Sequence, residues 1–276
     1  MMNTTKKLLK PVALNARLSL KNRIVMAPMT RAKADSNSNA TLAMAEYYAK
    51  RADAGLIITE GTVIRPDGIG YNNVPGIYTD DHIAKWRTVS QEVHKKGGKI
   101  FMQIWHVGRV SHPFFLQGAL PISCSATTMK GPVRRSDGLF YGTAREASIE
   151  EIQSLIDAYA KAATNAIKAG FDGVEIHGAN GYLIDQFLHY HSNIRQDSYG
   201  GNPARMTRFA LEVVRACGDA VGYHRLGIRL SPGAYLNEIE GDNRDRDVFT
   251  LLLSELNKLS LAYVHTGNFD DRVLFK

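Results

Sequence analysis

The chain has 276 residues, of which 44% are hydrophobic, so it is long enough to bury one large core. Its net charge of +7 comes from scattered lysines and arginines, with no basic run that predicts nucleic-acid binding. No apolar stretch is long enough to cross a bilayer, and residues 1–10 lack the apolar segment of a secretory signal. The two cysteines, Cys124 and Cys217, have no metal-ligand spacing. We therefore expect a soluble, cytoplasmic protein without a metal site, a membrane span or a nucleic-acid partner.

Short apolar runs alternate with longer amphipathic stretches along the chain. The apolar runs have the near-continuous hydrophobicity of strands that are buried on both faces of a parallel sheet. Ser148 and Glu151 have the spacing of a capping box, which predicts that a helix begins there. In chain order the predicted elements are a strand at 23–27, a helix at 40–54, a strand at 54–60, a helix at 80–96, a strand at 99–105, a helix at 148–169, a strand at 173–176, a helix at 202–216, a strand at 226–230, a helix at 247–258 and a strand at 261–265.

Repeated strand–helix units predict an α/β fold with a parallel sheet, either a barrel or a doubly wound sheet. No Gly-x-Gly-x-x-Gly turn follows the first strand, and this absence favours a (β/α)8 TIM-barrel type over a dinucleotide-binding fold. Only about six of the eight units are found, so residues 1–276 are predicted to form a single incomplete barrel domain. Residues 107–147 are rich in Gly, Pro, Ser and Thr, and we predict that they form a lid over the rim.

Polar side chains lie in or directly after the predicted strands. The carboxyl ends of parallel strands meet at one rim, which is where such enzymes place their chemistry. The segment 171–182 is the most informative, because its short apolar run ends in His177, Asn180 and Tyr182. The other polar groups expected at this rim are Thr30, Thr62, Gln103, Arg229 and His265.

This set of groups suits a flat heterocycle with carbonyl and imide edges. A guanidinium, a glutamine amide and a threonine hydroxyl cannot break a bond themselves, but they can bind such a ring. A nearby cation also stabilises negative charge that develops on the ring. Binding and charge stabilisation are what a protein supplies to a flavin, whose own chemistry is hydride transfer.

Several ordered segments resemble the Old Yellow Enzyme family of FMN-dependent ene-reductases, of the N-ethylmaleimide reductase-like type. They span essentially the whole chain in the family's order, which makes the resemblance far more specific than any one segment. The segments are 22–31, Tyr47-Tyr48 with Arg51-Ala52, 55–61, 103–109, 171–182 with 185–188, 193–201 and 227–232.

The resemblance implies a binding site for FMN and a role for each matching residue. Backbone atoms of two residues would contact the flavin, a hydroxyl would bond its carbonyl edge, a glycine would allow close backbone approach, and an amide with a guanidinium would bind the pyrimidine edge. In that order these residues are Pro28 and Met29, Thr30, Gly61, and Gln103 with Arg229.

The resemblance also implies a ping-pong reaction with NAD(P)H as the reductant and a small electron-poor alkene as the substrate. His177 and Asn180 would hold the oxygen of an enone, nitroalkene or maleimide, and Tyr182 would donate the proton. The sequence leaves the physiological alkene, the preference between NADPH and NADH, and the oligomeric state open, a homo-oligomer included.

Each of these residues also has a purely structural interpretation. His177 could be a satisfied core histidine, Tyr182 a rim aromatic, and Gln103 a polar bridge between strands. Arg229 could pair with a carboxylate such as Glu175 or Glu60. The remaining polar candidates are predicted to be structural, namely His189 and His191 as loop residues without metal-ligand spacing, and Arg195, Asp197 and Tyr199 as a salt-bridged loop.

Two departures from the family pattern limit these expectations. The residues after Gly201 differ from the usual Ser and Glu-Asn-Arg, which changes how the next helix is capped. In the family, the part beyond six units carries the FMN phosphate site, so weak FMN binding is expected if nothing completes the barrel. The alternatives are therefore a catalytically impaired barrel remnant or scaffold, and a relative of dienoyl-CoA reductase or trimethylamine dehydrogenase, which the two lone cysteines disfavour.

Overall fold

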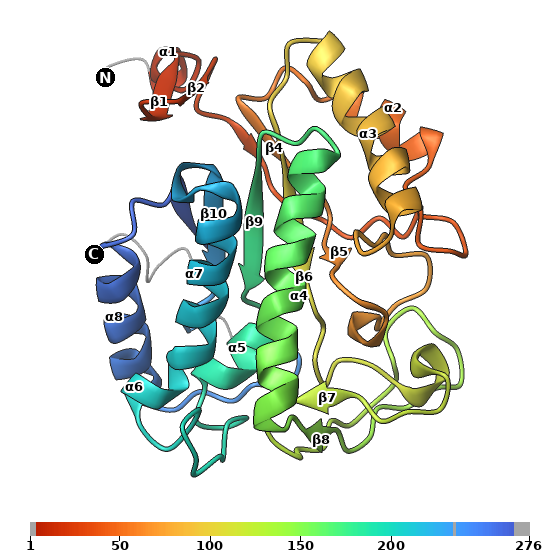
Figure 1. The fold of residues 1–276 in the computed structure, drawn as a ribbon, viewed down its shortest axis with the longest axis vertical. Helices are drawn as coiled ribbons and strands as arrows, with labels where there is room; N and C mark the ends of the chain where they lie inside the picture. Colours follow the sequence, from red (N-terminus) through yellow and green to blue (C-terminus); the bar gives the residue numbers. More distant parts are fainter. Residues whose placement is uncertain (1–3, 234–235, 268–276) are drawn as a thin grey trace.

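A curved parallel sheet forms the centre of the molecule in the computed structural model, which describes residues 4–233 and 236–267 (Figure 1). All neighbouring strands of this sheet run parallel, and short β5 (Thr62–Val63) lies beside β6. Across the sheet the remaining strands are β11 (Tyr263–Thr266), β10 (Leu226–Leu230), β9 (Gly173–Gly178), β6 (Ile100–Trp105), β4 (Leu56–Ile58) and β3 (Val25–Met26). Every strand predicted from the sequence is therefore present in one sheet.

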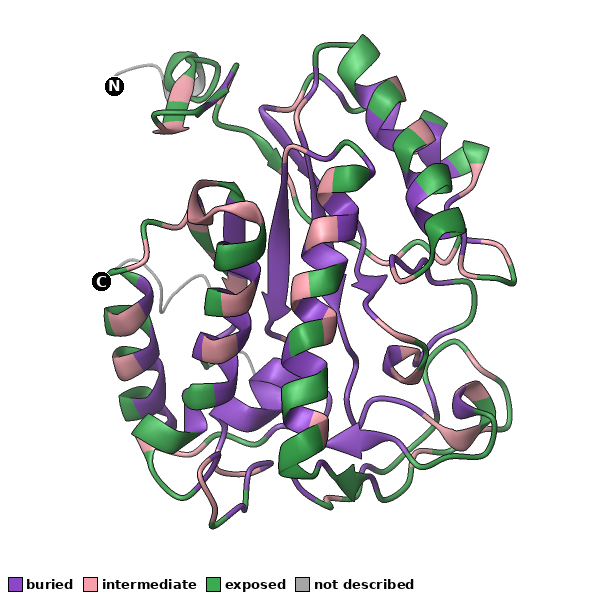
Figure 2. Ribbon diagram, in the orientation of Figure 1, coloured by how far each residue is buried: buried purple, intermediate pink, exposed green. Residues whose placement is uncertain are grey.

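Helices cover the outer face of the sheet and turn their buried sides toward it (Figure 2). The longest, α4, begins with the predicted capping box, in which Ser148 and Glu151 bond each other's backbone N–H groups. The predicted helix at 202–216 is instead α6 and α7, separated at Thr207. The helices are α1 (Thr4–Leu8), α2 (Leu42–Ala49), α3 (Asp80–Lys95), α4 (Ile149–Lys168), α5 (Leu183–Leu188), α6 (Pro203–Met206), α7 (Arg208–Val221) and α8 (Asp245–Leu256).

Alternation along the strands separates the two faces of the sheet. In β6, Ile100, Met102 and Ile104 belong to the large core shared with the helices. Phe101, which alternates with them, packs in a smaller cluster on the concave face. A hairpin that the sequence did not predict, β1 (Val12–Asn15) with β2 (Leu18–Leu20), contributes Leu18 and Leu20 to this inner cluster.

The segment 107–147 is more ordered than its composition predicted. It contains the short helix η2 (Pro113–Leu116), and β7 (Ile122–Ser123) pairs in parallel with β8 (Arg145–Glu146). Isolated bridges join Thr128 to Thr143 and Pro132 to Phe140. The further short helices are η1 (Pro66–Gly68) and η3 (Tyr223–Arg225). The role of 107–147 as a lid stays a prediction.

The sheet has two outer strands, β3 and β11, and each pairs with one strand among the described residues. A cavity of about 350 Å³ lies against both of them, and Val25, Ala27, Tyr263 and Val264 help to line it. Whether the sheet is six-eighths of a barrel stays a prediction.

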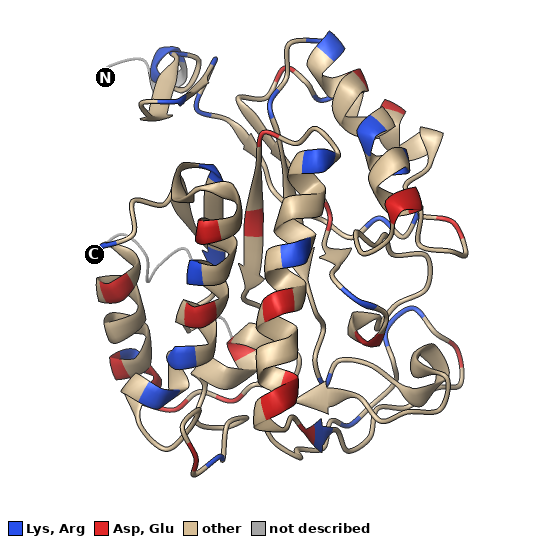
Figure 3. Cartoon of the chain, in the orientation of Figure 1, with Lys and Arg blue, Asp and Glu red and all other residues tan. Residues whose placement is uncertain are grey.

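Basic and acidic residues are both spread along the helices and loops, with no long stretch of one sign (Figure 3). Among residues 4–233 and 236–267, no helix has the length and hydropathy needed to cross a membrane. The same residues contain no cluster of three His, Cys, Asp or Glu side chains that could hold a metal ion.

Candidate active site

The strand register places the predicted polar groups next to one another. Gln103 on β6 lies beside Glu175 on β9, and His177, two residues further along β9, lies beside Arg229 on β10. Arg229 in turn lies beside His265 on β11. Residues paired in register share a face, so these side chains form two adjacent rows on the concave face of the sheet.

Glu175 is fully buried and connects three strands. The Gln103 amide nitrogen donates to Glu175 Oε1 at 2.7 Å, and His265 Nδ1 lies 3.0 Å from Glu175 Oε2. The polar bridge between strands, which was the structural alternative for Gln103, is therefore present. This contact uses one of the two N–H groups of the amide.

Arg229 has neither of the carboxylate partners considered from the sequence. Glu175 is engaged by Gln103 and His265, whereas Glu60 accepts from the Tyr48 hydroxyl. Within the described part of the chain no carboxylate lies within 4.0 Å of the guanidinium, and its buried Nε has no hydrogen-bond partner. Burial lowers the pKa of Arg229, which Glu175 opposes. A guanidinium nevertheless stays charged in proteins, so the concave face holds a cation that no described carboxylate pairs with.

An aromatic cluster lies at the same end of the strands. The Trp105 indole stacks between Tyr71 and His177, with ring centroids 5.9 and 5.8 Å away. Tyr182 meets the edges of Trp105 and His177 at 4.7 and 5.0 Å, and its hydroxyl lies 2.9 Å from the Tyr71 hydroxyl. Gly61 is required by this packing, because a Cβ there would lie 2.5 Å from the Trp105 ring.

His177 and Asn180 carry buried polar atoms that no described residue satisfies. These atoms are His177 Nδ1 and Asn180 Oδ1. Burial, together with nearby Arg229 and His265, lowers the pKa of His177 well below its ordinary value, so the imidazole is neutral. Buried polar groups rarely lack partners in native proteins, and a cluster of such groups indicates a missing ligand.

The residues after β3 lie at the edge of this region. Pro28 is buried, Thr30 is half-buried, and Met29 is 51% exposed. The Thr30 carbonyl accepts from Arg135, which belongs to the segment 107–147. That contact connects the predicted lid to the strand end that carries the predicted flavin-binding residues.

Tyr71 is a site residue that sequence reasoning missed. It lies between predicted elements, and nothing in its local pattern indicates that its hydroxyl meets Tyr182. The contact joins residues 111 positions apart, so only the tertiary structure reveals it.

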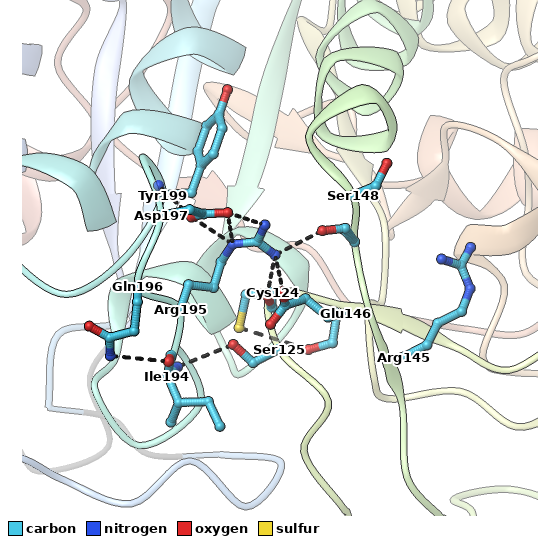
Figure 4. A network of polar contacts seen from close by, with 12 residues as sticks. Cys124, Ser125, Arg145, Glu146, Ser148, Ile194, Arg195, Gln196, Asp197 and Tyr199 are labelled. Carbon is cyan, nitrogen blue, oxygen red and sulfur yellow. Dashed lines mark hydrogen bonds and ion pairs between the residues drawn. The ribbon is translucent and has the colours of Figure 1, made fainter.

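The loop around Arg195 is structural, as predicted (Figure 4). The buried guanidinium pairs with Asp197 at 2.6 Å and donates to the carbonyl oxygens of Cys124 and Ala147. The Tyr199 hydroxyl donates to Glu212. These three side chains therefore find their partners within the chain.

Comparisons with known proteins agree with this arrangement. The model of the NADH:flavin oxidoreductase / NADH oxidase family matches residues 7–271. The chain is a member of that family. A flavin oxidoreductase of Emericella nidulans is 41% identical over 268 residues, which are 94% of this chain and 68% of the relative.

Two solved structures are similar to this fold. The Old Yellow Enzyme homologue from Zymomonas mobilis has a TM-score of 0.89 and 40% identity, over 94% of this chain and 73% of that one. Morphinone reductase in complex with tetrahydroNAD has a TM-score of 0.88 and 41% identity, over the same shares of the two chains. The predicted membership of the Old Yellow Enzyme family, an α/β TIM-barrel group of oxidoreductases, is thus confirmed.

The family uses FMN with NAD(P)H as the reductant, and the concave face fits such a group. Its unsatisfied atoms belong to a neutral imidazole, an amide and an unpaired guanidinium, together with the indole nitrogen of Trp105. A ring with carbonyl and imide edges carries both acceptors and a donor, so it can supply the hydrogen-bond partners that these atoms lack.

Proposed function

We propose that this chain is an FMN-dependent reductase of small electron-poor alkenes, such as enones, maleimides and nitroalkenes, with NAD(P)H as the reductant. The observation that carries the proposal is the group of buried, unsatisfied polar atoms on one concave face, beside the hydroxyl of Tyr182. Membership of the flavin oxidoreductase family supports it.

Three groups of residues in this chain would hold FMN. Arg229 and the free N–H of Gln103 would bind the pyrimidine edge, while Thr30 would bond the carbonyl edge from the end of β3. The backbone of Pro28, Met29 and Gly61 would contact the ring. When bound, FMN supplies the hydride that adds to the electron-poor carbon of the alkene.

His177 and Asn180 would bind the oxygen of the substrate. A neutral imidazole has one N–H, and an amide has two, so each residue can donate to a carbonyl or nitro oxygen. These bonds strengthen as negative charge develops on that oxygen, and each contributes about 3 kcal/mol of transition-state stabilisation. We propose that NAD(P)H and the alkene occupy this place in turn, which gives a ping-pong reaction.

Tyr182 would donate the proton to the α-carbon. Burial raises the pKa of its hydroxyl, so the proton stays on the oxygen at neutral pH until the reaction draws it to the substrate. The neighbouring Tyr71 hydroxyl, 2.9 Å away, would donate to the Tyr182 oxygen and so leave the Tyr182 proton for the substrate.

A second candidate is a barrel scaffold with impaired catalysis. The observation in its favour is the cavity of about 350 Å³ between β3 and β11, because β3 leads into Pro28, Met29 and Thr30. A sheet that is open at this place would hold the flavin loosely.

Flavin content and a two-step redox assay separate these candidates. The purified protein is expected to show visible flavin absorbance, to lose it on anaerobic addition of NADPH, and to regain it on addition of 2-cyclohexenone. A protein that binds no FMN when mixed with an excess, or that is bleached but not reoxidised by any of the three alkene classes, would contradict the proposal.

A further inference from the structure

A histidine between two carboxylates lies next to the loop that carries Asn180 and Gly181. His189 Nδ1 is 2.8 Å from Asp245 Oδ2, and His189 Nε2 is 3.3 Å from Asp185 Oδ1. All three residues are at most 3% exposed. Asp185 lies on α5, His189 directly follows that helix, and Asp245 begins α8, so this array joins two separate parts of the chain.

The array reaches the loop that carries Asn180. The second oxygen of Asp185 accepts from the Gly181 N–H at 2.7 Å and lies 3.4 Å from the Ser231 hydroxyl. The Ser231 oxygen in turn accepts from the Asn180 N–H at 2.8 Å. Both consecutive N–H groups of this loop therefore depend on Asp185, directly or through one hydroxyl.

The loop needs such support because of its backbone conformation. Asn180 and Gly181 have φ angles of 61° and 73°, in the left-handed region that residues other than glycine rarely adopt. Strained conformations persist only when the surrounding structure fixes them. A Cβ at Gly181 would lie 2.3 Å from the Leu236 carbonyl oxygen, so the loop is also confined from the other side.

Further hydrogen bonds fix the chain beside the array and beside this loop. Asp245 accepts from the Tyr190 N–H at 3.0 Å, and the Asn237 amide donates to the Asn180 carbonyl at 2.7 Å. Arg109 donates to the carbonyl of Asn237 at 3.2 Å. Asn180 is thus held at its N–H by Ser231, whose hydroxyl lies beside Asp185, and at its carbonyl by Asn237.

We propose that Asp185, His189 and Asp245 are positioning residues that fix the left-handed turn at Asn180 and so aim its amide at the substrate oxygen. The proposal rests on the function proposed above for Asn180. His189 acts by holding the Asp185 carboxylate in place, with Asp245 as its anchor, and none of the three touches the substrate.

The test uses one resonance and one kinetic constant. Residues 180–181 are the only Asn-Gly pair in the sequence, so Asn labelled with ¹³C at the carbonyl and Gly labelled with ¹⁵N give a single correlated signal, that of the Gly181 amide. His189→Gln is compared with His191→Gln, a matched control whose side chain is 34% exposed and contacts Glu240 instead.

We expect the Gly181 signal to move in His189→Gln and to stay in place in His191→Gln. In the FMN-loaded protein, the KM for 2-cyclohexenone should rise about tenfold in His189→Gln, the loss expected for one poorly aimed hydrogen bond, with flavin content unchanged. Asp245→Asn is the milder variant if His189→Gln does not fold, since it leaves both Asp185 contacts to the loop in place.

Each contrary result is informative. An unmoved Gly181 signal in folded His189→Gln, or in Asp245→Asn where that variant replaces it, overturns the proposal, whatever the KM does. A moved signal with an unchanged KM means that the array only stabilises the loop and does not aim Asn180 at the substrate, which also overturns the proposal. If the wild-type protein reduces no alkene, the proposed function fails, and the Gly181 signal still decides whether the array fixes the turn.

Discussion

Two polar loops of this protein, 193–201 and the loop after β9 that carries Asn180, differ in how many of their polar groups have hydrogen-bond partners among the described residues. In the loop 193–201, the Arg195 guanidinium is surrounded by Asp197 and two backbone carbonyl oxygens. At the end of β9, His177 is buried and Asn180 is half-buried, yet each keeps a buried polar atom for which no described residue is a partner. Both loops belong to the segments that resemble the family, so the presence of polar residues does not separate function from structure. Their unsatisfied atoms do.

This comparison predicts that substitutions in the β9 loop change activity and leave stability alone. Tyr182→Phe should lower the rate of flavin reoxidation by 2-cyclohexenone about 10²- to 10⁴-fold, because it removes the proposed general acid. Bleaching by NADPH, which needs no proton from Tyr182, should keep its rate. Stopped-flow absorbance measures both steps, and Tyr71→Phe, which keeps the donor, should have the smaller effect. An equal loss in both half-reactions would contradict the assignment.

The opposite result is expected in the loop 193–201. Arg195→Met should lower the free energy of unfolding by about 3–5 kcal/mol, because it leaves two buried carbonyl oxygens and the Asp197 carboxylate without their hydrogen-bond donor. Arg208→Met is the control, since its ion pair with Glu212 is half exposed and contributes about 0.5 kcal/mol. Urea unfolding measures both variants. A similar loss in the two would mean that the Arg195 network is no more than a surface contact.

The array behind the β9 loop should make stability depend on pH. Burial alone lowers the pKa of His189, but Asp185 and Asp245 outweigh it and raise that pKa to about 9. The folded protein then binds the proton more tightly than the unfolded chain, whose imidazole titrates near ~6.5. The stabilisation is therefore complete below pH ~6.5 and is lost as the pH rises through about 9, with a maximum of roughly 3 kcal/mol.

Urea unfolding between pH 6 and pH 10 measures this dependence. In His189→Gln the decline over that window should disappear, whereas His191→Gln should retain it. A decline of the same size in His189→Gln would assign it to other groups.

The smallest effect is expected at the start of α4. Ser148→Ala should cost about 1 kcal/mol, because the Ser148 hydroxyl accepts from the Glu151 N–H at the start of α4. Ser254→Ala, on the exposed side of α8, should cost nothing. Thermal unfolding compares the two, and neither should alter alkene reduction. A change in activity with Ser148→Ala would show that the site depends on α4.

The sequence by itself determined the strands, the long helices and which polar groups lie in or after neighbouring strands. Apolar runs identify the strands because both faces of a parallel sheet are buried, and the Ser148 capping box is local enough to be visible in the chain. His177, Asn180 and Arg229 were predicted to lie together because the carboxyl ends of parallel strands meet at one rim. These are consequences of short-range periodicity and of one topological rule.

Only the tertiary structure decided which polar groups are paired. Gln103 meets Glu175 because β6 and β9 are in register, and Tyr71 meets Tyr182 across 111 positions. His189 is buried between carboxylates from two helices, although its spacing from His191 predicts an ordinary loop residue. Hydrogen-bond satisfaction depends on which distant segments share a volume, and no local pattern in the chain encodes that.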